Sequence, residues 1–128
     1  MTALLDAHAF LWFITGSAKL SSTARSVIEE QSQTRLLSVA SLWEIAIKHS
    51  LGRLTLAAPF KEIIPLQMNT NGIGLLAIEL GHLDALVTLP FHHRDPFDRL
   101  LIAQAMVRQT PIVSADTAFD AYPVARLW

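Results

Sequence analysis

Four of the eleven acidic residues stand out because of their place in the hydropathy pattern. Asp6 and Asp116 each follow a short apolar run of the length of a buried strand. Glu44 and Asp98 share stripes at helical spacing with apolar residues, which directs each toward the interior. Carboxylates that meet in one cleft repel one another unless cations neutralise them, and Mg²⁺ or Mn²⁺ prefers oxygen ligands. The pattern predicts a carboxylate-held metal site, and such ions support phosphodiester hydrolysis.

The stretch 92–105 joins a charged loop directly to an apolar helix. Asp95 occupies the capping position, and Pro96 takes the first helical position, where its missing N–H costs nothing. Asp98 falls in the first turn, on the inward stripe of that helix. Acids are also favoured in first turns by the helix dipole, so this stretch alone does not separate a metal ligand from an ordinary helix-start residue.

Glu44 has a competing interpretation. Ser41 and Glu44 match the S-x-x-E capping box, in which the glutamate only reaches back to a backbone N–H. Ser38 is an equally good cap and comes directly after a predicted strand. The sequence favours Ser38 as the start of a helix that continues to about residue 51, with Glu44 inside it.

Basic residues lie on or beside the two helices that carry Glu44 and Asp98. They are Lys48, Arg53, Arg94 and Arg99. Because lysine and arginine neutralise backbone phosphates, we expect them to contact a nucleic acid. A solvated charged face is the alternative for any one of them.

The adjacent residues His92 and His93 raise the possibility of a zinc site. Neighbouring side chains in an extended loop point in different directions, and no other histidine has ligand spacing with this pair. We expect both to be loop or surface residues near the substrate. The three tryptophans, at positions 12, 43 and 128, are expected in the core or in an interface.

Strand and helix patterns alternate along the whole chain. The expected strands cover residues 2–5, 36–37, 75–78, 111–114 and 124–127; the other expected helices cover about 7–14, 22–31, 59–69, 82–89 and 96–108, with a helical turn near residue 119. Pro65 and the turn signal at 69–72 make the helix at 59–69 the least regular. The alternation predicts an α/β fold: one domain over residues 1–128, with a mostly parallel sheet between two helical layers. Ligands bind beyond the carboxyl ends of such strands.

Bulk composition sets the remaining limits. The chain is 52% hydrophobic and only 16% charged, so we expect a partner or a second copy to cover one face. Its net charge of −1 restricts any nucleic-acid contact to a local patch. The absence of cysteine favours a reducing compartment. Asp6 interrupts the first apolar run before it could cross a bilayer, and we expect a cytoplasmic protein with no membrane partner.

Four motifs together resemble those of PIN-domain ribonucleases, and more narrowly the VapC-type toxins of bacterial toxin–antitoxin pairs. They are LLDAH at 4–8, SLWEIAIK at 41–48, RDPFDRLLIAQA at 94–105 and VSAD at 113–116. The resemblance covers essentially the whole chain and implies a three-layer α/β/α fold. It is loosest at 116–119, where the family often has an asparagine with a nearby acid.

The resemblance also implies a function. It implies an endoribonuclease that uses Mg²⁺ or Mn²⁺, with Asp6, Glu44, Asp98 and Asp116 as metal ligands and RNA as substrate. Ser114 matches a small hydroxyl position that holds a metal-bound water. A homodimer and a cognate antitoxin that covers the active-site groove are implied as well.

Three alternative functions are compatible with parts of the sequence. A phosphorylated receiver domain has similar length and alternation, but it needs a lysine after the last main strand, and the only lysines are at positions 19, 48 and 61. A PIN-like binding module without catalysis would not need the four acids. A nuclease acting on DNA remains an alternative, because metal-assisted attack on a phosphodiester does not require a 2′-hydroxyl.

Overall fold

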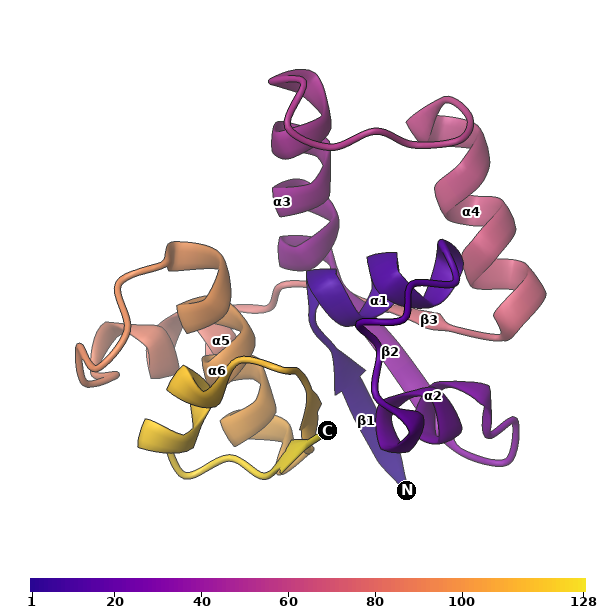
Figure 1. Cartoon of the computed structure of the whole chain (residues 1–128). Coiled ribbons are helices and arrows are strands. Elements are labelled where there is room, and N and C mark those ends of the chain that lie inside the picture. Colours follow the sequence, from indigo (N-terminus) through magenta and orange to yellow (C-terminus); the bar gives the residue numbers. More distant parts are fainter.

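The computed structural model describes residues 1–128 and is built around a five-stranded parallel sheet (Figure 1). The strand order is β3-β2-β1-β4-β5. The strands are β1 (Thr2–Leu5), β2 (Thr34–Ser38), β3 (Gly74–Leu76), β4 (Ile112–Val113) and β5 (Arg126–Leu127). Leu4 of β1 lies opposite Leu36 of β2 and Ile112 of β4, which places β1 at the centre of the sheet. The predicted parallel sheet is confirmed.

Six α-helices and one 3₁₀-helix cover the two faces of the sheet. They are α1 (Ala7–Ile14), α2 (Ser22–Glu29), α3 (Val39–Ser50), α4 (Phe60–Asn71), α5 (Leu80–Val87), α6 (Pro96–Arg108) and η1 (Thr117–Ala121). Successive side chains of a strand point to opposite faces. Accordingly, Ala3 and Leu5 belong to one buried cluster, with Phe10 of α1, and Leu4 belongs to another, with Leu101 of α6. The predicted three-layer α/β/α arrangement is confirmed.

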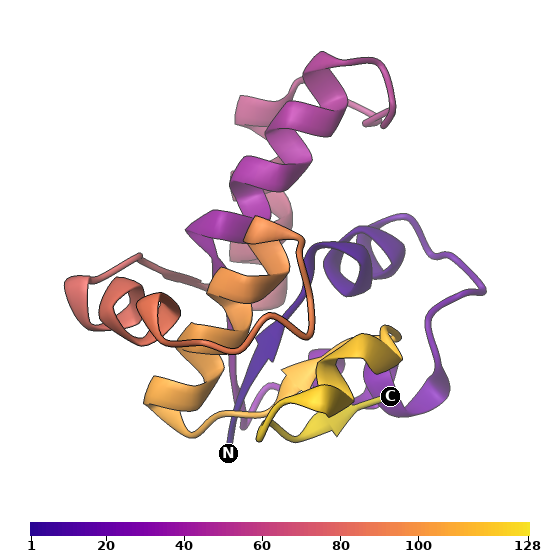
Figure 2. The ribbon, with the colours of Figure 1, turned by 90° about the vertical axis from the view of Figure 1, so that its left-hand side faces the viewer.

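Helices α3 and α4 extend away from the sheet and are joined by a long loop at their far ends (Figure 1). Figure 2 shows α6 beside the base of α3, in agreement with the contacts between these two helices. The two helices that carry Glu44 and Asp98 are therefore neighbours in space, although one begins at Val39 and the other only at Pro96.

Some predicted boundaries are wrong. Helix α4 continues through Pro65 to Asn71 and ends only at Gly72, whose φ of 67° is left-handed. Helix α5 begins at Leu80 rather than at residue 82, because the Glu79 backbone N–H donates to Nδ1 of His82 in a reciprocal cap. Strand β5 is limited to two residues. No helix combines the length and apolarity that crossing a bilayer requires.

Candidate active site

Asp6 lies at the carboxyl end of β1 and also caps α1. Its Oδ1 accepts a 2.8 Å hydrogen bond from the Ala9 backbone N–H. The side chain is buried, and burial raises its pKa, while hydrogen bonds from Ser114 and from the Ala9 N–H act in the opposite direction. The predicted position at a strand end is confirmed, and the sheet, the helix and the loop after β4 all fix this carboxylate.

Glu44 is a buried acid in the interior of α3. The helix is capped by Ser38, whose Oγ accepts the Ala40 N–H at 3.1 Å, so Glu44 lies well beyond the first turn and forms no capping box. Its Oε2 is paired with Nζ of Lys48 at 2.7 Å. The inward orientation predicted from the apolar stripe is confirmed.

The two acids at the start of α6 have different roles. Oδ1 of Asp95 accepts the N–H groups of Phe97 at 2.9 Å and of Asp98 at 3.1 Å, which makes Asp95 the helix cap. The pKa of Asp98 is raised to about 7, first by burial and then by the negative charges of Asp95, Glu44 and Asp6, while His93 acts in the opposite direction. Asp6 and Glu44 therefore lie close enough to Asp98 for their charges to act on its carboxyl.

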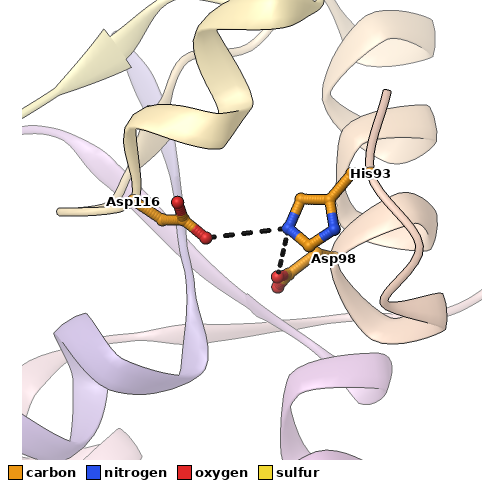
Figure 3. Close-up of side chains that lie close together, drawn as sticks. All are labelled: His93, Asp98 and Asp116. Atoms are coloured by element: carbon orange, nitrogen blue, oxygen red, sulfur yellow. Dashed lines mark ion pairs between the residues drawn. The ribbon is translucent and has the colours of Figure 1, made fainter. Parts of the chain in front are cut away.

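A histidine lies between Asp116 and Asp98 (Figure 3). Nε2 of His93 lies 3.0 Å from Oδ2 of Asp98 and 3.6 Å from Oδ2 of Asp116. These three ligand atoms lie within 4.8 Å of one another, and Asp6 and Glu44 lie outside this compact group. Asp116 is half-exposed and caps η1 through the Ala118 N–H at 2.9 Å.

His93 was not predicted from the sequence to lie between Asp98 and Asp116. The side chain is only 16% exposed, in contrast to the expected surface residue. The sequence feature that could have indicated this role is its closeness to Asp98. His93 lies five residues before that acid, in the loop that leads into α6. His92 agrees with the expectation, because it is exposed and packs edge-on against Tyr122.

The prediction that Arg99 contacts phosphate does not hold. Its guanidinium is buried and donates to the carbonyl oxygens of Leu89, Pro90 and His93, at 3.0, 2.9 and 3.3 Å. The group stacks over Phe91, with 3.9 Å to the ring centre. Arg99 therefore fixes the loop that carries His93.

The other predicted substrate contacts have different environments. Arg94 is exposed, and Lys48 is half-exposed beside Glu44. Ser114 is fully buried; its Oγ accepts the Asp116 N–H at 3.0 Å, and its hydroxyl also bonds to Asp6. Ser114 thus connects two of the acids. Trp43, which was expected in a core or an interface, is 57% exposed and packs edge-on against Phe97.

The donor set of the cleft fits a hard divalent cation. Only one lysine contacts the acids Asp6, Glu44 and Asp98, and the pKa values of Asp6 and Asp98 are raised first by burial and further by the charges of neighbouring acids. A shallow pocket of about 250 Å³ opens beside Asp6 and Asp116. The arrangement provides room for a cation and for a phosphate at the carboxyl ends of β1 and β4.

Comparisons with known proteins give one family and one recurring fold. The family model described as PIN domain matches residues 3–125. Ribonuclease VapC16 of Mycobacterium tuberculosis is 34% identical over 58 residues, 45% of this chain and 41% of that protein, so the aligned part is less than half of the relative.

Three solved structures share the fold. VapBC2 from Rickettsia felis, bound to a DNA fragment from its promoter, has a TM-score of 0.74 at 12% identity, over 98% of this chain and 97% of that chain. FitAcB from Neisseria gonorrhoeae has a TM-score of 0.67 at 14% identity, over 97% and 95%. A toxin–antitoxin complex from Klebsiella pneumoniae has a TM-score of 0.64 at 14% identity, over 94% and 92%.

Proposed function

The chain belongs to the PIN-domain family, and from this premise we propose that it is a metal-dependent endoribonuclease that hydrolyses phosphodiester bonds in RNA. The observation that carries the proposal is the group of acids near the carboxyl ends of β1 and β4, where burial, and then the crowded charges of Asp95, Glu44 and Asp6, raise the pKa of Asp98 to about 7. Such crowding is relieved by a divalent ion.

We assign the metal-binding role to Asp6, Glu44 and Asp98, with Asp116 contributing directly or through water. Mg²⁺ or Mn²⁺ bound there supplies activation of water and stabilisation of the charge on the phosphate. The chain itself orients these groups: α1, α3 and α6 each begin at a side-chain cap, and the caps fix where each acid lies.

Ser114 and two basic residues complete the assignment. Ser114 orients Asp6 and the loop that carries Asp116. Arg94 is exposed beside α6 and is suited to an RNA backbone phosphate. Lys48 neutralises Glu44 until a cation binds and is then available to a phosphate.

We also propose that the protein is the toxin of a toxin–antitoxin pair, that an antitoxin covers this cleft, and that the toxin is a homodimer. Solved structures with this fold include toxin–antitoxin complexes. Large apolar side chains are exposed around α5, among them Leu80 at 82%, Val87 at 80% and Phe91 at 80%, which is typical of a surface that a protein partner covers. The mass of the isolated protein in solution tests the dimer.

Cleavage of total RNA by the wild type and by Asp6→Asn tests the enzymatic proposal. We expect cleavage by the wild type with Mg²⁺ or Mn²⁺, none in excess chelator, and none by Asp6→Asn. Glu62→Gln changes an exposed acid of α4 and serves as the control with full activity. Full cleavage by Asp6→Asn, or by the wild type without metal, would contradict the proposal. If only single-stranded DNA of matched sequence were cleaved, the enzyme would be a deoxyribonuclease.

A further inference from the structure

His93 has a buried nitrogen, Nε2, that lies between Asp98 and Asp116 and has no hydrogen-bond partner. Nε2 is shielded from solvent and makes no well-aligned hydrogen bond, although carboxylate oxygens of Asp98 and Asp116 lie 3.0 and 3.6 Å away (Figure 3). An enclosed polar atom without an aligned partner is rare in proteins and indicates a missing ligand.

The other ring nitrogen determines which form of the imidazole is present. Nδ1 of His93 accepts the Asp95 backbone N–H at 3.2 Å. A backbone N–H is always a donor, so Nδ1 must present its lone pair. In the neutral ring the proton is therefore on Nε2, and an N–H group points into the space between the acids.

This tautomer is incompatible with metal coordination by the same nitrogen. A metal-bound histidine uses the lone pair of one nitrogen and donates the N–H of the other to an acceptor. Here the outer nitrogen faces a donor, and the inner nitrogen carries the proton. The spacing of His93, Asp98 and Asp116 resembles a metal site, but the hydrogen bonding makes His93 a donor within it.

The donor is fixed before any ligand binds. The His93 backbone N–H donates to Oη of Tyr122 at 2.9 Å, and that hydroxyl donates to the Pro90 carbonyl at 2.7 Å. Nη1 of Arg99 binds the His93 carbonyl as well. Such preorganised donors stabilise developing negative charge without reorganisation cost.

We propose that His93 is a catalytic residue that donates its Nε2–H to a non-bridging oxygen of the phosphate bound in this cleft, and that it is not a metal ligand. The inference rests on the proposed nuclease function. A cation held by Asp98 and Asp116 would compete with the Nε2–H for their oxygens, and a phosphate oxygen would then be the available acceptor. A phosphate oxygen is anionic, which makes this a charge-assisted hydrogen bond.

The tautomer can be measured directly by long-range ¹H–¹⁵N NMR of the imidazole nitrogens, with the His93 signals identified by their loss in His93→Gln. At a pH where the ring is neutral, we expect a protonated Nε2 and an unprotonated Nδ1, both without metal and with saturating Mg²⁺. A proton on Nδ1, or loss of the Nε2 proton when Mg²⁺ binds, would overturn the proposal.

Substitution separates a donor from a ligand. In His93→Leu we expect the Kd for Mn²⁺ to change by less than about threefold, because no ligand is lost, and kcat for RNA to fall about 10²-fold. His93→Gln carries an amide N–H that reaches the region of Nε2 and should restore part of kcat. His92→Leu is the matched control, with wild-type kcat and metal affinity. Loss of Mn²⁺ affinity by tenfold or more in both variants, or unchanged kcat in His93→Leu, would contradict the proposal.

A third measurement keeps this proposal separate from the nuclease proposal. Inorganic phosphate is titrated into the Mn²⁺-loaded wild type and into Mn²⁺-loaded His93→Leu, with thermal melting to confirm that both are folded. We expect at least about tenfold weaker phosphate binding in the variant. If the wild type cleaves no RNA but this difference is found, the nuclease proposal fails and the donor role of His93 stands. Equal phosphate affinity would refute the donor role.

Discussion

Ser38 and Gln104 share a hydrogen bond of 2.6 Å in the fully buried interior, from the serine Oγ to the glutamine Oε1. Ser38 caps α3, which carries Glu44, and Gln104 lies on α6, which carries Asp98. The glutamine amide also donates to the Ala77 carbonyl at 3.3 Å, after β3. One buried side chain therefore links the two acid-bearing helices to each other and to the sheet.

Replacement of that glutamine should affect both stability and metal binding. In Gln104→Leu, the Ala77 carbonyl loses this donor and the buried Ser38 loses its acceptor. We expect the free energy of unfolding in urea to fall by about 1–3 kcal/mol and the affinity for Mn²⁺ to fall about tenfold. Gln31→Leu changes an exposed glutamine with one long hydrogen bond of 3.5 Å and should alter neither. Wild-type Mn²⁺ affinity in Gln104→Leu would show that the link does not position the acids.

The stability of the metal-free protein should decrease as pH rises. Asp98 ionises near 3.8 in the unfolded chain, and its pKa is about 7 in the folded protein. Between these values the folded state retains a proton that the unfolded state has lost, so the free energy of unfolding falls through this range. The pKa of Asp6 is raised by burial and acts in the same direction.

Thermal melting in chelator, at about pH 5.5 and about pH 8, measures this effect. We expect a lower Tm at the higher pH, and a larger increase in Tm on addition of Mg²⁺ there, because the ion binds ionised carboxylates. Asp98→Asn should flatten the pH dependence. A Tm in chelator that rises between the two pH values would contradict the assignment.

Asp95 and Asp98 should respond differently to the same substitution. Asp98→Asn removes a proposed ligand charge, so we expect metal affinity and RNA cleavage to be lost. Asparagine and aspartate are about equally good helix caps, so Asp95→Asn should retain the fold and most metal binding. Calorimetric titration of Mn²⁺ into both variants gives the comparison. Equal losses in the two variants would mean that Asp95 also contacts the ion.

Substitutions of Arg94 and Arg99 should affect different properties: RNA binding for Arg94 and the stability of the fold for Arg99. Arg99→Met removes the donor to the Leu89 and His93 carbonyls and leaves the Pro90 carbonyl with the Tyr122 hydroxyl alone. We expect it to destabilise the protein by several kcal/mol, measured by urea unfolding. Arg94 is exposed, and Arg94→Ala should leave stability within about 0.5 kcal/mol. We expect Arg94→Ala to weaken RNA binding and to reduce the salt dependence of the binding constant. An unaltered salt dependence would exclude a phosphate contact at Arg94.

Local sequence determined most of the secondary structure. Strand β1 and helices α1 and α6 have the predicted bounds, because hydrophobic period, helix caps and stop residues act within a few positions. The end of α4 was predicted too early, since the Asn-rich segment after Pro65 still forms helix as far as Gly72. There, contacts of Ile64 and Met68 with the core outweigh weak helix propensity.

The sequence by itself determined the α/β class, the parallel sheet, the position of Asp6 at a strand end and the inward orientation of Glu44 and Asp98, because each follows from the spacing of residues along the chain. Only the tertiary structure decided which polar groups meet. It placed His93 between Asp98 and Asp116, and it turned Arg99 away from the cleft to bind three carbonyls. The physical reason is that these partners come from different elements. Their distances depend on how β4, α6 and the loop before α6 pack together, and no local pattern records that packing.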